Sequence, residues 1–143
     1  ADHWLLLRED TQARRRNYRR LPRQFTVAWR AVNGARSTRL FVARYGKVPV
    51  AAMLFLLHGK GASYHVGWSD ELGRQTHAHT LLLWKAATWL SERGHAWIDL
   101  GTLDTETTPG LARFKLGCGA RRLTLGATCL DAPGTRAVTR VFG

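Results

Sequence analysis

Residues 39–68 read RLFVARYGKVPVAAMLFLLHGKGASYHVGW, and this stretch decides the fold. Three segments, Arg39–Tyr45, Val48–Leu57 and Ala62–Trp68, have strand-like patterns and are separated by short glycine-containing turns. Val48–Leu57 is apolar almost throughout, which is typical of a central strand covered on both faces. Because the segments are consecutive and the turns are tight, we expect an antiparallel meander.

The chain after the meander predicts a crossover. A polar loop is expected over Ser69–Thr76, then a helix over His77–Arg93 and a short buried strand over Trp97–Gly101. A strand–helix–strand passage is almost always right-handed with parallel strands, so the sheet should be mixed. A short helix over Gly110–Leu116 and a last strand over Arg122–Leu130 complete the expected order.

The chain before the meander is helical and basic. Arg8–Arg20 predicts a polar helix, and a second helix follows Leu21-Pro22. That second helix should pack through residues at helical spacing, namely Phe25, Ala28, Trp29 and Val32. With 143 residues, the chain fits a single domain. We divide it into a basic helical part (1–38), a core (39–130) and a tail (131–143). The fold class is α/β (α+β).

The net charge is +12, and residues 1–44 hold eleven arginines and three acids, which leaves +8 in that part. Such an arm attracts phosphates, although an arginine-rich solvated helix has the same composition. No apolar run approaches the roughly 20 residues that span a bilayer, and there is no secretory leader. Cys118 and Cys129 lack metal-site spacing and are interpreted as reduced packing residues. We expect a cytoplasmic protein.

Three motifs add a resemblance. Residues 64–70 read YHVGWSD, residues 97–101 read WIDLG and residues 109–119 read PGLARFKLGCG. Together they resemble the FemAB-like branch of the GNAT acyltransferases, in which Y-H-x-G-x-S, D-L-G and G-L-x-x-F-K-x-x-F-G recur in this order. The resemblance implies a GNAT-like mixed sheet with helices on both faces. It also implies transfer of an acyl or aminoacyl group to an amine acceptor.

The start of the long helix is the expected donor site. Its first N–H groups and positive dipole end favour a phosphate, and Arg74 would add charge. The alternative is an ordinary helix start capped by Thr76. The segment only partly matches the Q/R-x-x-G-x-G/A loop of GNAT enzymes, since Ala78 replaces the first glycine. The donor-binding candidates are Arg74, Gln75, Thr76, His77, Ala78 and His79.

Acyl transfer needs a group that takes the amine proton, a donor to the carbonyl oxygen and an acid for the leaving group. Asp99, Asp104 and Lys115 are the catalytic candidates. Asp99 is either a base with a raised pKa or a loop cap or arginine partner, Asp104 and Glu106 could lie in a solvated loop, and Lys115 could be a surface lysine. The substrate-binding candidates are Tyr64, His65, Trp68, Glu106 and Phe114, although Phe114 and an inward His65 could be core residues.

The sequence therefore predicts an N-acyltransferase domain that uses acyl-CoA or aminoacyl-tRNA. The alternatives are a non-catalytic phosphate- or nucleic-acid-binding module that uses the arginine arm, and an inactive half-domain with a scaffolding role. Expected partners are a donor, a small amine acceptor, tRNA, and either a second copy or a second GNAT-like half. No metal is expected, because His77 and His79 cannot share a helix face.

Overall fold

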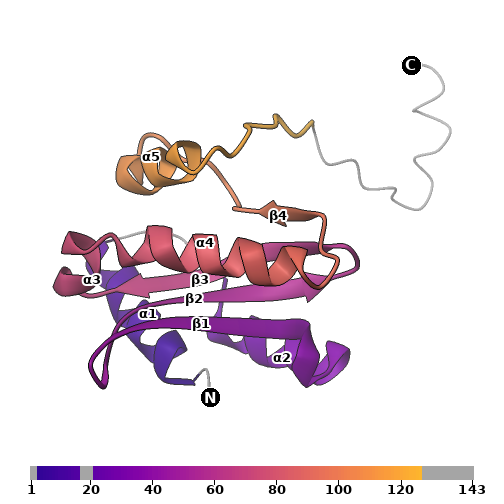
Figure 1. The fold of residues 1–143 in the computed structure, drawn as a ribbon, viewed down its shortest axis with the longest axis horizontal. Coiled ribbons are helices and arrows are strands. Elements are labelled where there is room, and N and C mark those ends of the chain that lie inside the picture. The colour runs from indigo at the N-terminus through magenta and orange to yellow at the C-terminus, as the bar shows by residue number, and fades with distance from the viewer. Residues whose placement is uncertain (1–2, 17–20, 127–143) are drawn as a thin grey trace, which may run out of the picture.

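The computed structural model describes residues 3–16 and 21–126, which form a mixed sheet with helices on both faces (Figure 1). This is the α/β class that the sequence predicts. None of the described helices is both long enough and apolar enough to cross a membrane.

The sheet has the strand order β1-β2-β3-β4. Its strands are β1 (Thr38–Tyr45), β2 (Val48–His58), β3 (Gly61–Ser69) and β4 (Trp97–Asp99). The first three form the expected antiparallel meander, and β4 pairs with β3 in parallel. The predicted parallel pairing of the strands on either side of the crossover is therefore confirmed.

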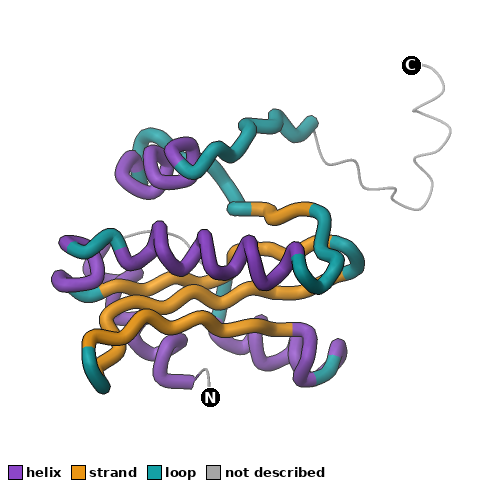
Figure 2. The backbone as a smooth tube through the Cα atoms, in the orientation of Figure 1, coloured by secondary structure: helices purple, strands orange, loops and turns teal. Residues whose placement is uncertain are grey.

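The helices cover both faces of the sheet. On one face lie α1 (His3–Arg16) and α2 (Arg23–Asn33), and on the other lies α4 (Ala78–Ser91) (Figures 1 and 2). A 3-10 turn, η1 (Ala35–Ser37), joins α2 to β1. The last described helix, α5 (Pro109–Gly117), follows β4 and lies on the α4 side of the sheet.

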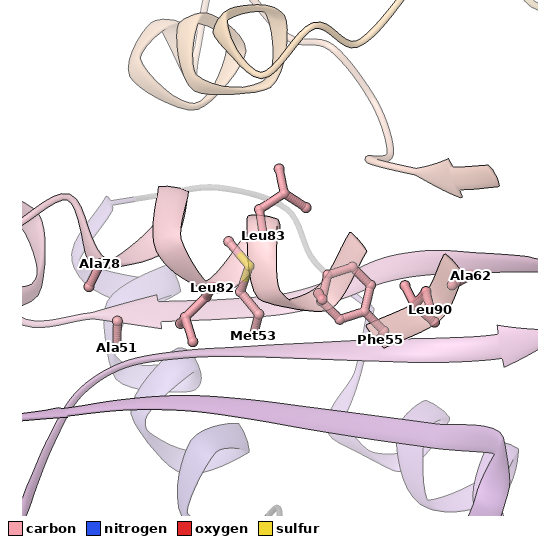
Figure 3. Close-up of a cluster of buried hydrophobic side chains, with 9 residues drawn as sticks. Ala51, Met53, Phe55, Ala62, Ala78, Leu82, Leu83 and Leu90 are labelled. Carbon is pink, nitrogen blue, oxygen red and sulfur yellow. The ribbon is translucent and has the colours of Figure 1, made fainter. Parts of the chain in front are cut away.

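The central strand β2 separates two apolar clusters. On the α4 side, Ala51, Met53 and Phe55 pack with Leu82 and Leu90 (Figure 3). On the other side, Ala52 and Leu54 pack with Leu5 and Leu6 of α1 and with Val66 and Trp68 of β3. Residues alternate between faces along a strand, so the near-continuous apolar run serves both clusters, as predicted.

Four expected elements differ in the structure. The helix expected over Arg8–Arg20 is α1, which begins at His3. The strand expected to be buried over Trp97–Gly101 is the shorter β4, in which Trp97 and Asp99 are exposed.

The expected loop Ser69–Thr76 contains a short helix, α3 (Glu71–Gln75), because the Asp70 carboxylate accepts a bond from the Gly73 N–H at 2.7 Å and caps its start. The last strand predicted over Arg122–Leu130 is not formed in its described part, 122–126, and the remainder lies outside the described residues, as does the tail.

The predicted packed face of α2 is confirmed only in part, because the Phe25 and Trp29 rings contact His65 and His58 of the sheet whereas Ala28 and Val32 are exposed. Val32 is 83% exposed, whereas Thr26 is buried. The Thr26 hydroxyl lies 2.7 Å from the His65 ring nitrogen Nε2, and the Trp29 indole donates to the Ser37 carbonyl at 3.2 Å. The face of α2 that contacts the sheet therefore consists of Phe25, Thr26 and Trp29. Cys118 is also exposed rather than packed, and Cys129 lies outside the described residues.

Candidate functional site

Strands β3 and β4 part after only three residue pairs. The pairs are Gly61 with Trp97, Ala62 with Ile98 and Ser63 with Asp99. Strand β3 continues to Ser69, and within the described residues no strand pairs with its outer edge beyond Ser63. The two parallel strands therefore separate after the Ser63–Asp99 pair. An open backbone edge of this kind can bind an extended ligand by strand-like hydrogen bonds.

A bulge determines which side chains of β3 face α4. Leu54 pairs with Val66 and Phe55 pairs with Tyr64, so His65 is an extra residue. The Tyr64 ring packs against the α4-side cluster, with its centroid 5.8 Å from that of Phe55. The His65 ring contacts α2 through Thr26, and burial lowers the pKa of His65. Tyr64 and His65 thus face opposite sides of the sheet, and the His65 ring lies on the side away from α4.

Trp68 contributes its backbone, not its side chain, to the open edge. The indole is only 7% exposed and packs edge-to-face on Trp4 beneath α1, with the Arg8 guanidinium 4.6 Å from its ring centroid. The Trp68 carbonyl lies 3.1 Å from Nε2 of His79. That contact connects the edge of β3 to the start of α4.

The positive charge expected from Arg74 is already compensated. Its guanidinium bonds to the Glu71 carboxylate at 2.6 Å and to the Ser69 carbonyl at 3.0 Å. Gln75 also donates to Glu71, at 3.3 Å. Both side chains therefore stabilise α3. A phosphate near this segment would be attracted by backbone N–H groups rather than by Arg74.

Thr76 is not the cap of the long helix. Its hydroxyl donates to the Leu72 carbonyl at 2.8 Å, and α4 begins after His77 without a side-chain cap. His77 has the left-handed φ of 52°, an uncommon conformation for a residue with a side chain. The first N–H groups of a helix usually have no partner within it, but here the Thr80 N–H donates to the His77 carbonyl at 3.0 Å. Ala78 is buried and faces the core.

The start of α4 also meets α5. The His79 ring centroid lies 6.0 Å from that of Phe114. Phe114 packs against the α4-side cluster together with Ile98 and Leu100, so its position is largely that of a core residue. Leu83, which is buried, points away from the sheet toward the α5 side (Figure 3). The open edge of β3, the start of α4 and α5 are thus held near one another.

Lys115 and Asp99 shape the loop after β4. The Lys115 side chain is buried, and its ammonium donates to the Thr102 carbonyl at 2.7 Å. Burial lowers the pKa of Lys115, and the charge of Asp99 partly offsets that effect. The Asp99 carboxylate accepts a bond from the Gly101 N–H at 2.7 Å, while the residue remains exposed. Asp99 is therefore a loop cap that solvent can reach.

Asp104 is also occupied by its own loop. Its carboxylate accepts bonds from the N–H groups of Glu106 and Thr107, at 3.0 Å and 2.8 Å, and from the Thr107 hydroxyl. The Thr107 bonds are the main cause of a lowered pKa of Asp104. This carboxylate stays ionised and is a weaker proton acceptor than an ordinary one. Glu106 is exposed beside it.

Sequence reasoning missed one feature of this site. Gly67 faces the α4 side directly beside the Tyr64 hydroxyl, and a Cβ on Gly67 would overlap that oxygen. A glycine inside a strand often marks such a close approach, so the residue type itself was the available signal. Among the residues that the structure describes, no three His, Cys, Asp or Glu side chains gather as a metal site requires.

Residues 1–120 match the sequence model of a family described as an acetyltransferase (GNAT) domain. The chain belongs to this GNAT family. No curated protein and no solved structure matched the chain. The GNAT match includes the basic N-terminal helices as well as the sheet, α4 and α5. An N-acyltransferase-type function therefore applies to the domain that contains the parting of β3 and β4.

Proposed function

We propose that this GNAT domain transfers an acyl group from acyl-CoA to an amine, with the donor lying along the open edge of β3. The observation that carries the proposal is the register of the parallel pair: β4 ends opposite Ser63, and β3 continues to Ser69. The extended, amide-containing arm of the donor can pair with this edge as a strand would.

The start of α4 suits the other end of the donor. Phosphates are stabilised at helix starts by N–H groups and by the helix dipole, and the start of α4 is tied to the edge of β3 by the His79–Trp68 contact. The glycines that ease close backbone approach are absent. A left-handed turn at His77 immediately precedes this end of the helix.

We call the region where β3 and β4 separate, beyond the Ser63–Asp99 pair, the parting. It has a wide end and a narrow end. The wide end lies by Trp68 and His79, and the narrow end lies where Ser63 meets Asp99. A donor with its phosphates at α4 carries its thioester toward the narrow end. There the exposed Asp99 carboxylate ends β4, and it is our candidate to accept the proton of the attacking amine. Lys115 and Asp104 act indirectly, by holding the loop that follows.

In this reaction the amine nitrogen forms a bond to the acyl carbon and the carbon–sulfur bond breaks. The amine proton leaves through Asp99, and the CoA sulfur departs as a thiolate that takes a proton from solvent. Substrate chemistry of this kind requires no metal. It does require the amine to reach the narrow end unprotonated, because a protonated amine is not a nucleophile.

We assign the domain to the FemAB-like branch on its three motifs, and this leaves an aminoacyl-tRNA donor as the second candidate. The supporting observation is the charge of +8 in residues 1–44. Charge of this sign binds RNA in a strongly salt-dependent way. Replacement of Arg14, Arg15 and Arg16 by Ala should abolish tRNA binding if the arm serves such a donor, and should leave acetyl-CoA binding unchanged.

Acyl-CoA binding can be tested by adding a single exposed negative charge at the start of α4. Thr80→Glu puts a carboxylate in the first turn of α4, where we expect it to weaken acetyl-CoA binding on the order of tenfold. Thr88→Glu is the matched control, because Thr88 is exposed on the same helix but far from its start. Calorimetric titration measures both. No binding of any acyl-CoA by the unmodified protein would refute the donor assignment.

A further inference from the structure

Tyr64 lies at the narrow end of the parting. It is the first residue of β3 beyond the last pair with β4, Ser63 with Asp99. Its side chain is half-buried on the α4 side and packs against the cluster that contains Phe55. A group that enters the parting along β3 therefore reaches the Tyr64 ring before it reaches the paired part of the two strands.

Gly67 determines how that ring lies. The bulge at His65 puts Tyr64 and Gly67 on the same face of the strand. Every heavy atom that a Cβ on Gly67 would approach most closely belongs to the Tyr64 ring or hydroxyl. The ring thus lies along β3, toward the wide end, with its hydroxyl over Gly67. Any side chain at position 67 would displace the hydroxyl.

The proposed direction of the donor determines where its acyl group lies relative to Tyr64. With phosphates at the start of α4, which is tied to Trp68, the acyl end points toward Ser63 and Asp99. The acyl group then ends against the Tyr64 ring. Ile98 and Leu100, which flank Asp99, pack against the α4-side cluster from β4 and its following residue.

We infer that Tyr64, held flat by Gly67, limits the acyl group to short chains. The inference rests on the proposed acyl-CoA function. A longer chain would have to displace a packed aromatic ring or bury its methylenes against a phenol hydroxyl, and hydrophobic sites discriminate single methylenes by roughly 10–200-fold. Gly67 is then a specificity-determining residue although it has no side chain.

The experiment compares CoA, acetyl-CoA, butyryl-CoA and octanoyl-CoA by calorimetric titration. The unmodified protein should bind acetyl-CoA and butyryl-CoA more tightly than octanoyl-CoA. Tyr64→Ala should improve octanoyl-CoA relative to acetyl-CoA by about tenfold or more. Tyr64→Phe keeps the ring and should keep the preference. Tyr45→Ala is the matched control, since Tyr45 is 70% exposed at the far end of β1.

Gly67→Ala gives an independent readout. It displaces the Tyr64 ring without removing it, so it should change the octanoyl-to-acetyl ratio in a Tyr64 background and leave it unchanged in a Tyr64→Ala background. Should Tyr64→Ala not fold, Tyr64→Leu preserves apolar packing while shortening the side chain, and the same change of ratio is expected.

The possible failures are distinguishable. If Tyr64→Ala weakens all acyl-CoAs by one common factor, Tyr64 has only a packing role and the inference is overturned. An unmodified protein that prefers octanoyl-CoA overturns it as well. If the unmodified protein binds none of the four ligands, the proposed function itself fails, and the inference fails with it.

Discussion

Strands β1 to β3 with α1 and α4 form one region of the molecule, and it contrasts with the segment from β4 to α5. In the first region, residues 51–55 of β2 are completely buried, between clusters on both faces. In the second, Trp97 and Asp99 of β4 are exposed, as are Leu111 and Leu116 of α5. The first region, which we call the body, is held by apolar packing. The second, the β4–α5 segment, packs on the α4-side cluster only through partly buried side chains such as Ile98 and Phe114, and the Lys115–Thr102 contact holds its loop.

The contrast indicates a division of roles. The open edge of β3 and the start of α4 belong to the body, so the proposed donor-binding groups lie on its more rigid part. Asp99, Asp104 and Lys115 belong to the β4–α5 segment, whose few buried contacts predict easier local opening. We therefore expect substrate positioning to depend on the body and acceptor access to depend on the segment.

The largest expected effect is loss of packing in the body. Phe55→Ala removes a completely buried ring and should lower the free energy of unfolding by about 3–5 kcal/mol. Leu116→Ala in α5, at a position 46% exposed, should lower it by less than about 1 kcal/mol. Urea denaturation measures both. Similar effects from the two substitutions would contradict the distinction between body and segment.

The next largest effect concerns the β4–α5 segment alone. Lys115→Met removes the ammonium that bonds to Thr102 and keeps much of the side-chain volume. Amide hydrogen exchange should become faster across 100–108, while exchange in β2 stays unchanged. Acceleration spread evenly over the whole protein would show that Lys115 supports the body rather than the loop.

A pH effect should come from His65 in the body. Burial lowers its folded pKa, so the folded state binds fewer protons than the unfolded state. The contribution of His65 to the free energy of unfolding is therefore most favourable above the unfolded pKa of about 6.5, and it decreases as the pH falls through the folded pKa. Stability should thus decrease from pH 7.5 to pH 5, and this decrease should shrink in His65→Gln. An unchanged profile in that variant would assign the pH dependence to other groups.

The smallest effect is expected at the junction before α4. His77 has a left-handed φ of 52°, which glycine adopts without a steric penalty. His77→Gly should therefore leave unfolding stability within about 1 kcal/mol of the original or raise it. Thermal denaturation provides the measurement. A loss well above that range would mean that the imidazole makes a contact that stabilises the turn.

Periodicity was sufficient to predict the meander and the parallel crossover, because buried strands and helices differ in spacing. It could not orient α2, since the stripe from Phe25 to Val32 says nothing about whether a partner covers it. The Thr26–His65 contact, which joins residues distant in sequence, decides that orientation. The Asp70 cap shows a different limit of sequence reasoning. The capping residue for α3 was present in the sequence, but the helix that follows it is only five residues long and was predicted as a loop.

The site was predictable in composition more than in geometry. Of the motif residues, Tyr64 faces α4, whereas the His65 and Trp68 side chains lie on the opposite face of the sheet. The carboxylates could not be assigned, because a sequence does not show that Asp99 and Asp104 bond to nearby backbone N–H groups. The compensation of Arg74 by Glu71 also depends on α3, which forms within the expected loop.

The most direct test of the central claim is a titration of ¹⁵N-labelled protein with acetyl-CoA, followed by amide NMR. If the donor lies along the open edge of β3, the largest shift changes should fall on Tyr64–Ser69 and on the first turn of α4, with β1 unaffected. Changes confined to α1 and α2, or no changes at saturating acetyl-CoA, would contradict the claim.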